Sequence, residues 1–251
     1  MSRRHPFLAP NIEGGFIPFA HRGGSRSHPE NSLAAFRHAW DLGFRYLETD
    51  VQTTSDGEVV AFHDDDLQRT CGVARRISEM TWAEVRTARI DGREPIPRMV
   101  DLLEEFPGAY VNIDAKSDAV VEPLLRTLRD TGVLGRVCIG AFSHRRLLRI
   151  RAEFGSAVCT SASPLEVALW MMGRLPLGPS CLQVPVRQGG LPVVTERRVG
   201  RAHAANCPVH VWTVDDPVDM QWLLDIGVHG IMTDSGDVLR AVAVTNGIWS
   251  T

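Results

Sequence analysis

The chain has 251 residues, 44% of them hydrophobic, and a formal net charge of −3 with a pI near 6.3. That length and hydrophobic content suffice for one domain with a sizeable core, because α/β barrels of about 200–250 residues fold as single units. The charge balance provides no basic field, so no nucleic-acid partner is expected. No apolar run approaches the roughly 20 residues of a membrane-spanning helix, so no integral membrane segment is expected either.

The five cysteines, at positions 71, 138, 159, 181 and 207, form no C-x-x-C motif. Three of them, Cys138, Cys159 and Cys181, lie in short apolar runs, which predicts buried free thiols. Proline and polar residues interrupt the N-terminal segment, so no signal peptide is expected. These features together indicate a reducing compartment, and we expect a cytoplasmic protein.

The first part of the chain alternates short apolar runs with a helical pattern. Asn31 or Ser32 is the expected N-cap of the first long helix, and Gly43 is expected to end it. The predicted elements, in chain order, are a strand over 17–20, a helix over about 32–42, a strand over 44–47 and an extended segment over 58–62.

The remainder repeats this alternation after an interruption. The segment 65–107 is long and polar, with short helical patterns over 81–88 and 98–105, and we interpret it as an insertion beside the barrel mouth. Strands that alternate with helices imply a parallel sheet, and close to eight such units imply a closed TIM-type (β/α)8 barrel. We therefore predict one domain over 1–251, with a small insertion after the second βα region. The later predicted strands are 111–113, 137–139, 157–159, 182–184, 209–212 and 230–232, and helical patterns cover 118–130, 144–154 and 218–226.

Residues with catalytic chemistry follow the predicted strands, at the end of the sheet where such barrels place their active sites. Glu48 and Asp50 are two positions apart, so in an extended segment both point to one side, which suits a shared cation. Cleavage of a phosphodiester requires charge neutralisation, a proton acceptor and a proton donor, and this set supplies all three. The residues concerned are His21, Arg22, Glu48, Asp50, His63, Asp64, Asp114, Lys116, Trp212 and Asp234.

Each of these residues also has a structural interpretation when taken alone. Arg22 could pair with Glu30, and Asp114 with Lys116 could be a plain ion pair. For Asp234 the favoured interpretation is an N-cap of the last helix. Their joint placement at the ends of predicted strands favours a functional site.

The residues then resemble a known family, the glycerophosphodiester phosphodiesterases, from Ala20 to Asp234. Matching order and spacing over so much of the chain is hard to obtain by chance. The motifs that carry the resemblance are Ala20-His21-Arg22-Gly23-Gly24, Pro29-Glu30-Asn31-Ser32, Glu48-Thr49-Asp50-Val51-Gln52-Thr53, Phe62-His63-Asp64, Leu67-Gln68-Arg69-Thr70, Pro95-Ile96-Pro97, Trp212-Thr213-Val214 and Gly227-Val228-His229-Gly230-Ile231-Met232-Thr233-Asp234.

The resemblance implies a TIM-type barrel that hydrolyses a small-molecule glycerophosphodiester to glycerol 3-phosphate and an alcohol. It implies that His21 and His63 are the two catalytic histidines. Glu48 and Asp50 resemble ligands of one divalent metal, usually Mg²⁺ or Ca²⁺, and Asp114 occupies the place of a third ligand. Oxygen ligands of this kind suit Mg²⁺ or Ca²⁺ better than zinc.

Supporting roles follow from the same resemblance. Arg22 and Lys116 are similar to a phosphate clamp, and Trp212, which could otherwise be a core residue, is similar to a wall for the glycerol moiety. Glu30 resembles a residue that steadies Arg22 or a histidine. Asp64, beside His63, could orient that imidazole or cap the following turn.

The chain departs from the family pattern at three places. Asp114 is one methylene shorter than the usual glutamate, which affects the metal site more than the histidines. Asp215 replaces a frequent asparagine and adds negative charge near the rim. The run Ala141-Phe142-Ser143 keeps the phenylalanine but lacks the usual preceding serine.

Two other functions remain open at this stage. The first is a lysophospholipase D-like or phospholipase C-like activity on the same barrel, with the apolar stretch 165–172 at its mouth, although that stretch is expected to pack as a helix against the barrel. The second is a barrel that binds phosphodiesters without catalysis, because a fold alone does not establish chemistry. The sequence indicates neither the preferred alcohol nor the oligomeric state.

Overall fold

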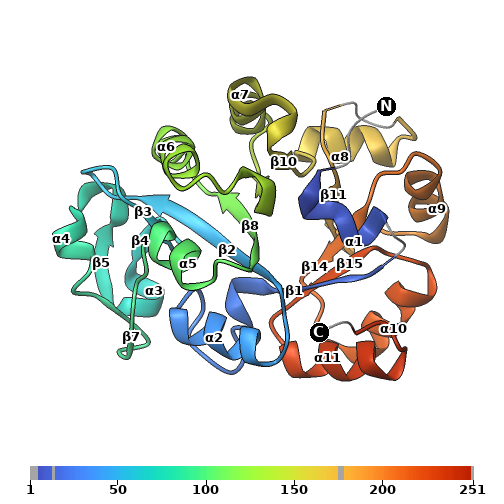
Figure 1. Ribbon diagram of the computed structural model, residues 1–251, viewed down its shortest axis with the longest axis horizontal. Coiled ribbons are helices and arrows are strands. Elements are labelled where there is room, and N and C mark those ends of the chain that lie inside the picture. Colours follow the sequence, from blue (N-terminus) through green and yellow to red (C-terminus); the bar gives the residue numbers. More distant parts are fainter. Residues whose placement is uncertain (1–4, 13–14, 175–177, 250–251) are drawn as a thin grey trace.

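Eight parallel strands form a barrel surrounded by helices in the computed structural model (Figure 1), which describes residues 5–12, 15–174 and 178–249. Most predicted strands agree with the observed ones within two residues, and the strand over 209–212 agrees at both ends. The barrel strands are β1 (Ile17–Ala20), β2 (Tyr46–Thr53), β8 (Tyr110–Ala115), β9 (Val137–Gly140), β10 (Cys159–Thr160), β11 (Leu182–Pro185), β14 (Val209–Trp212) and β15 (Gly230–Thr233).

The sheet closes on itself. Its strand order is β10-β9-β8-β2-β1-β15-β14-β11, and all of these neighbours pair in parallel. The two ends of this path meet where Ser161, after β10, forms a parallel bridge with Cys181, before β11. The backbone N–H of Ala162 donates to the Cys181 carbonyl at 3.0 Å across this junction. The predicted (β/α)8 barrel is therefore confirmed.

Helices cover the outside of the barrel (Figure 1). Among the described residues, no helix has both the length and the apolar character needed to cross a membrane. The long helices are α2 (Leu33–Asp41), α5 (Met99–Glu105), α6 (Val121–Thr131), α7 (His144–Phe154), α8 (Pro164–Met171), α9 (Glu196–Ala204), α10 (Pro217–Asp225) and α11 (Gly236–Thr245), and short elements are η1 (Pro6–Leu8), α1 (Ala9–Ile12), η2 (His21–Gly23), η4 (Leu134–Arg136), η5 (Gly155–Ala157), β12 (Arg187–Gln188) and β13 (Leu191–Pro192).

Local sequence signals explain where the helices begin and how they pack. Ser32 caps α2, because its hydroxyl accepts the backbone N–H of Ala35 at 3.1 Å. Of the two predicted caps, Ser32 is the correct one. Helix α6 buries Val121, Leu124, Leu125 and Leu128, which are spaced for one helical face, against the barrel.

Strand β2 is longer than the sequence predicts. The predicted strand ended at residue 47, but β2 continues to Thr53, so Glu48 and Asp50 lie inside the strand rather than after it. The strand continues because it pairs with β8 on one side and with β3 (Val59–Ala61) on the other. β3 is antiparallel to β2, so this predicted extended segment is an addition to the sheet and not a barrel strand.

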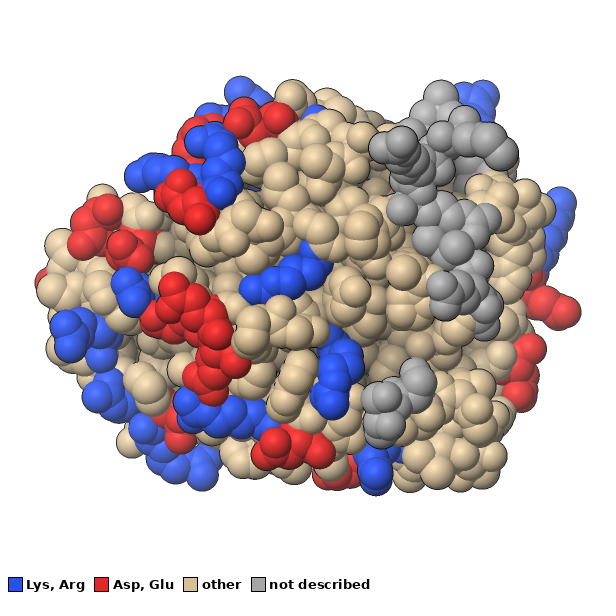
Figure 2. Space-filling view, in the orientation of Figure 1, with Lys and Arg blue, Asp and Glu red and all other residues tan. Residues whose placement is uncertain are grey.

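The segment after β3 forms a small extra layer with a core of its own, whose buried members include Leu67, Ile77 and Ile90. Helix α5 lies inside the range predicted as the insertion, 65–107, but its Met99, Leu102 and Leu103 belong to the main core. On the face in Figure 2, positive and negative side chains intermingle over this layer at the left. The elements of the layer are β4 (Asp66–Leu67), α3 (Gln68–Cys71), β5 (Val73–Arg76), η3 (Ile77–Glu79), α4 (Trp82–Val85), β6 (Arg89–Ile90) and β7 (Glu94–Pro95).

The N-terminal end of the barrel interior is closed by the chain's first described residues. Phe7 is fully buried, and its carbonyl accepts the hydroxyl of Tyr46 at 2.8 Å. His210 on β14 is also fully buried, with its Nε2 2.9 Å from Oδ1 of Asn11. Burial lowers the pKa of His210 to about 3. The folded protein therefore keeps this imidazole neutral at acidic pH.

This burial predicts a specific acid sensitivity. An unfolded histidine titrates near pH ~6.5, so the stabilising effect of neutral His210 is complete above that pH and is lost progressively as the pH falls toward 3. When the pH is lowered from about 7.5 to about 5, the unfolding free energy of the parent should therefore fall by about 2 kcal/mol more than that of His210→Gln. Urea titrations at both pH values measure the two differences. Equal losses in parent and variant would contradict the assignment.

Candidate active site

A turn of unusual backbone conformation carries the first two site residues from β1. Arg22 has φ 51° and Gly23 has φ 83°, both in the left-handed region. A Cβ on Gly23 would lie 2.7 Å from Cβ of Ala35, so only glycine allows η2 to pack this closely on α2. The turn directs the backbone N–H of Arg22 to the carboxylate of Glu48, at 2.9 Å.

Three carboxylates lie at the C-terminal end of the barrel interior, two of them, Glu48 and Asp50, buried and the third, Asp114, partly exposed. Glu48 and Asp50 alternate along β2 and therefore share a face, as predicted, and both line one pocket. Asp114 on β8 also lines it, and it is the direct cross-strand partner of Asp50. These carboxylates come from two adjacent strands, so their negative charges are concentrated in a small volume.

Two cations partly compensate that charge. Nζ of Lys116 lies 3.0 Å from both Asp50 and Asp114, and Nε of Arg22 lies 3.0 Å from Asp50. Burial alone would raise the pKa of Asp50, but Lys116 and Arg22 lower it below its usual range. Burial raises the pKa of Glu48, and it also raises that of Asp114 despite the nearby Lys116. At Glu48 and Asp114 the effect of burial therefore outweighs that of the nearby cations.

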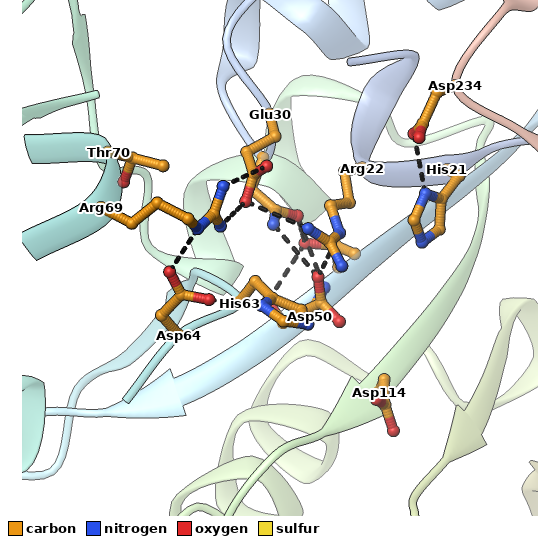
Figure 3. Close-up of polar contacts among 12 residues, drawn as sticks. His21, Arg22, Glu30, Asp50, His63, Asp64, Arg69, Thr70, Asp114 and Asp234 are labelled. Carbon is orange, nitrogen blue, oxygen red and sulfur yellow. Dashed lines mark hydrogen bonds and ion pairs between the residues drawn. The ribbon is translucent and has the colours of Figure 1, made fainter. Parts of the chain in front are cut away.

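Asp234 lies against the first histidine. Its Oδ1 is 2.8 Å from Nδ1 of His21 (Figure 3), whereas the residue before α11 that occupies the N-cap position is Ser235. The favoured sequence interpretation of Asp234 as a helix cap was therefore wrong. Burial alone would lower the pKa of His21, but the carboxylates of Glu48 and Asp234 outweigh it and raise that pKa.

Asp215 holds the loop that carries Asp234. Its Oδ1 accepts the Thr233 hydroxyl at 2.8 Å and the backbone N–H groups of Asp234 and Ser235 at 2.9 and 3.1 Å. One of its oxygens is therefore used to fix the loop after β15. This residue, which departs from the family pattern, positions the partner of His21.

The second histidine has its own carboxylate. Nδ1 of His63 lies 2.6 Å from Oδ1 of Asp64, and the side-chain amide of Gln52 donates to the His63 and Asp64 carbonyls at 3.3 and 3.1 Å. Arg69 on α3 donates to the other oxygen of Asp64 at 2.6 Å. Two roles were predicted for Asp64, orienting the imidazole of His63 or capping the following turn. The geometry agrees with the first.

Glu30 connects both halves of this network. It lies between two guanidinium groups (Figure 3), 3.2 Å from Arg22 and 2.5 Å from Arg69. The structural pairing of Arg22 with Glu30 is thus present together with the contact of Arg22 to Asp50. The sequence does not predict this role of Arg69, whose only signal is its place in the motif Leu67-Gln68-Arg69-Thr70.

The pocket above these groups has a volume of about 460 Å³ and two chemically different walls. The polar wall is the cluster described above. The apolar wall includes Phe142 and, on α8, Val167 and Met171. Trp212 stands between them, with its ring centroid 5.7 Å from that of Phe142. Glu30, Asp64 and Asp234 do not line this pocket but contact Arg22, His63 and His21, which do. The other eight predicted site residues all line it: His21, Arg22, Glu48, Asp50, His63, Asp114, Lys116 and Trp212.

Comparisons with known proteins agree with this arrangement. The model of the glycerophosphoryl diester phosphodiesterase family matches residues 21–238. A probable glycerophosphodiester phosphodiesterase of Mycobacterium tuberculosis is 40% identical over 96% of this chain and 97% of its own length. A human lysophospholipase D is 36% identical over 95% of this chain and 87% of its own.

A solved structure shows the same fold. The phosphodiesterase of Oleispira antarctica, in complex with the product sn-glycerol-3-phosphate, superposes with a TM-score of 0.78 at 20% identity, covering 93% of this chain and 98% of that one. The matched region contains every pocket residue from β1 to β15 described above. The chain therefore belongs to the glycerophosphoryl diester phosphodiesterase family.

Proposed function

We propose that this protein hydrolyses glycerophosphodiesters to sn-glycerol 3-phosphate and an alcohol, with His21 and His63 as the proton-transfer groups. One observation carries the proposal. Both imidazoles line the pocket that holds three carboxylates, an arginine and a lysine, and each has its Nδ1 engaged by a separate carboxylate. This arrangement supplies two independent proton-transfer groups beside a site for an anion.

The engaged nitrogens decide which atoms act. With Nδ1 of His21 on Asp234 and Nδ1 of His63 on Asp64, the two Nε2 atoms are the ones that act on the substrate, and that of His21 lies 3.8 Å from a carboxylate oxygen of Glu48. One Nε2 takes the proton from the attacking oxygen, and the other gives a proton to the leaving oxygen. Two histidines with separate partners can hold opposite protonation states at the same time.

Arg22 and Lys116 bind the phosphate oxygens in this proposal. Both cations line the pocket, and both are held by Asp50. An arginine presents two donors to one phosphate, while the lysine acts as a point charge. Positioned donors of this kind stabilise the charge that develops on phosphate oxygens in the transition state.

Glu48, Asp50 and Asp114 would hold a divalent cation, Mg²⁺ or Ca²⁺. The chemistry of the donor set fits, because all three side chains offer the hard oxygens that these cations prefer. When bound, the cation would neutralise negative charge on the phosphate.

All five cysteines are free, which supports our proposal of a reducing, cytoplasmic location.

The first test is release of glycerol 3-phosphate from glycerophosphocholine and glycerophosphoethanolamine. Turnover should stop in EDTA, return with Mg²⁺ or Ca²⁺, and fall by at least about 100-fold in His21→Ala. Glu48→Gln should require a higher Mg²⁺ concentration, whereas the surface variant Glu105→Gln should not. Turnover that survives EDTA would refute the metal proposal, and tight substrate binding without turnover would favour the non-catalytic barrel.

A second prediction concerns Asp234. Asp234→Asn keeps the shape of the contact but removes the negative charge that favours a proton on Nδ1 of His21. We expect kcat to fall about 10- to 100-fold with little change in KM. Asp216→Asn, which makes the same change at the cap of α10, is the matched control and should keep both kcat and most of the stability, because asparagine caps a helix about as well as aspartate. Equal kcat values for Asp234→Asn and the parent would remove Asp234 from the mechanism.

The apolar wall favours a second substrate class, a lysophospholipid. Helix α8 directs Val167, Ala168 and Met171 into the pocket, and its Trp170 packs into the core. The stretch 165–172 therefore packs against the barrel as expected, and it also lines the pocket. An acyl chain next to this wall would lose water from apolar surface, and a related human protein is named a lysophospholipase D.

A charge placed on that wall separates the two substrates. Val167→Asp should lower kcat/KM for lysophosphatidylcholine about tenfold, which corresponds to roughly 1.4 kcal/mol, and should change that for glycerophosphocholine little. Leu148→Asp, on the exposed surface of α7, is the control. If both substrates lose activity equally, α8 is not a chain-binding wall.

A further inference from the structure

Three thiols meet inside the barrel, at the end opposite the active site. Cys138 on β9 and Cys159 on β10 are direct cross-strand partners, and Cys181 lies at the junction that closes the sheet. All three are fully buried, and their sulfur atoms lie within 4.8 Å of one another, with 3.9 Å between those of Cys138 and Cys181. Within the described part of the chain, this is the one group of histidine, cysteine or acidic residues that brings three ligand atoms so close.

This cluster is separate from the proposed reaction centre. Alternate side chains along each strand face the same side. Cys138 is therefore one such position before Gly140 on β9, and Asn112 is one such position before Asp114 on β8. Between the two ends lies a polar layer in which the amide of Gln183 donates to Asn112 at 2.8 Å. Cys138 is the direct cross-strand partner of Asn112 in this layer, and the ligand chemistry of the sulfur cluster differs from that of the pocket carboxylates.

The sulfur positions suit a soft metal ion. A Zn–S bond is about 2.3 Å, and with bond angles between tetrahedral and trigonal two such sulfurs lie roughly 3.8–4.0 Å apart. The separation of Cys138 and Cys181 already has this value. Thiolates select thiophilic ions such as Zn²⁺ and its heavier analogue Cd²⁺ over the hard cations that suit the pocket carboxylates.

The surroundings limit the charge that the cluster can carry. Its neighbours are mostly apolar and aromatic, among them Phe7, Phe19 and Tyr46. Binding releases thiol protons, and a divalent ion held by two thiolates is neutral overall, which is the form that an apolar environment tolerates best.

The N-terminal segment seals this region. Both ring nitrogens of His5 are engaged, Nδ1 by the Phe7 backbone N–H at 3.2 Å and Nε2 by the Ala157 carbonyl at 3.1 Å. His5 therefore stays a covering residue, and the ligands that we assign are the three sulfur atoms. An ion enclosed in this way would enter during folding and exchange slowly afterwards.

We propose that Cys138, Cys159 and Cys181 form a structural site for one thiophilic divalent ion, of the Zn²⁺ and Cd²⁺ class. The ion joins β9, β10 and β11 at the point where the sheet closes. It is independent of the phosphodiester reaction and of the divalent cation proposed for the pocket.

The test uses the full chain produced in medium with added Zn²⁺ or Cd²⁺, purified under reducing conditions and dialysed against EDTA. The parent should retain one ion per chain by elemental mass spectrometry. The cadmium form should show the ultraviolet charge-transfer band of cadmium–thiolate bonds. Both forms should have a higher midpoint of thermal unfolding than protein from metal-depleted medium. A parent without retained ion and without the band overturns the proposal, whatever the variants do.

Variants then locate the ion. Cys138→Ser and Cys159→Ala should lose the ion and the band, while Cys207→Ser, which changes a cysteine outside the cluster, should keep both. Glu48→Gln should also keep both, which distinguishes this site from the pocket. Residual turnover reports that each cysteine variant is folded. A band that persists in folded Cys138→Ser and Cys159→Ala would place the ion elsewhere and overturn the assignment.

Discussion

The balance of buried charge at the C-terminal end of the barrel is the constraint on which the rest of the site depends. Glu48 and Asp50 are buried, with the partly buried Asp114 directly across the sheet from Asp50, and isolated buried carboxylates are too costly to remain ionised. Lys116 and Arg22 compensate mainly Asp50, the one carboxyl of the three whose pKa is lowered. Burial raises the pKa values of Glu48 and Asp114, and an anionic substrate would add further negative charge beside them.

The extra layer after β3 contributes to the same balance. Its own small core fixes α3, which directs Arg69 to Asp64 and Glu30, and these in turn hold His63 and Arg22. A guanidinium shared between two carboxylates restricts both partners, because its donors have a fixed planar geometry. The segment that interrupts the alternation of barrel strands and helices therefore helps to position His63.

The sequence predicted the barrel and most of the pocket because both depend on local patterns. Short apolar runs, capping residues and polar residues at strand ends can be recognised from the sequence alone. They placed His21, His63 and Lys116 correctly in the pocket. The role of Asp234 was missed, because its partner is 213 positions away and a cap is the common local interpretation. The length of β2 was underestimated, because pairing with β3 and β8 keeps polar residues in the strand. Pairing between strands and contacts of this range are fixed by tertiary structure.

The same limit applies to the cysteines. The apolar runs predicted three buried thiols, and burial is confirmed for each, but the sequence separations of Cys138, Cys159 and Cys181 contain no metal-binding motif. Only closure of the sheet brings them together, since Cys181 reaches β10 through the bridge to Ser161. The barrel thus separates hard oxygen donors at one end from soft sulfur donors at the other, with the Asn112–Gln183 layer between them. Such a separation lets one fold present two donor sets with different ion preferences, because ligand type governs which cation each end can hold.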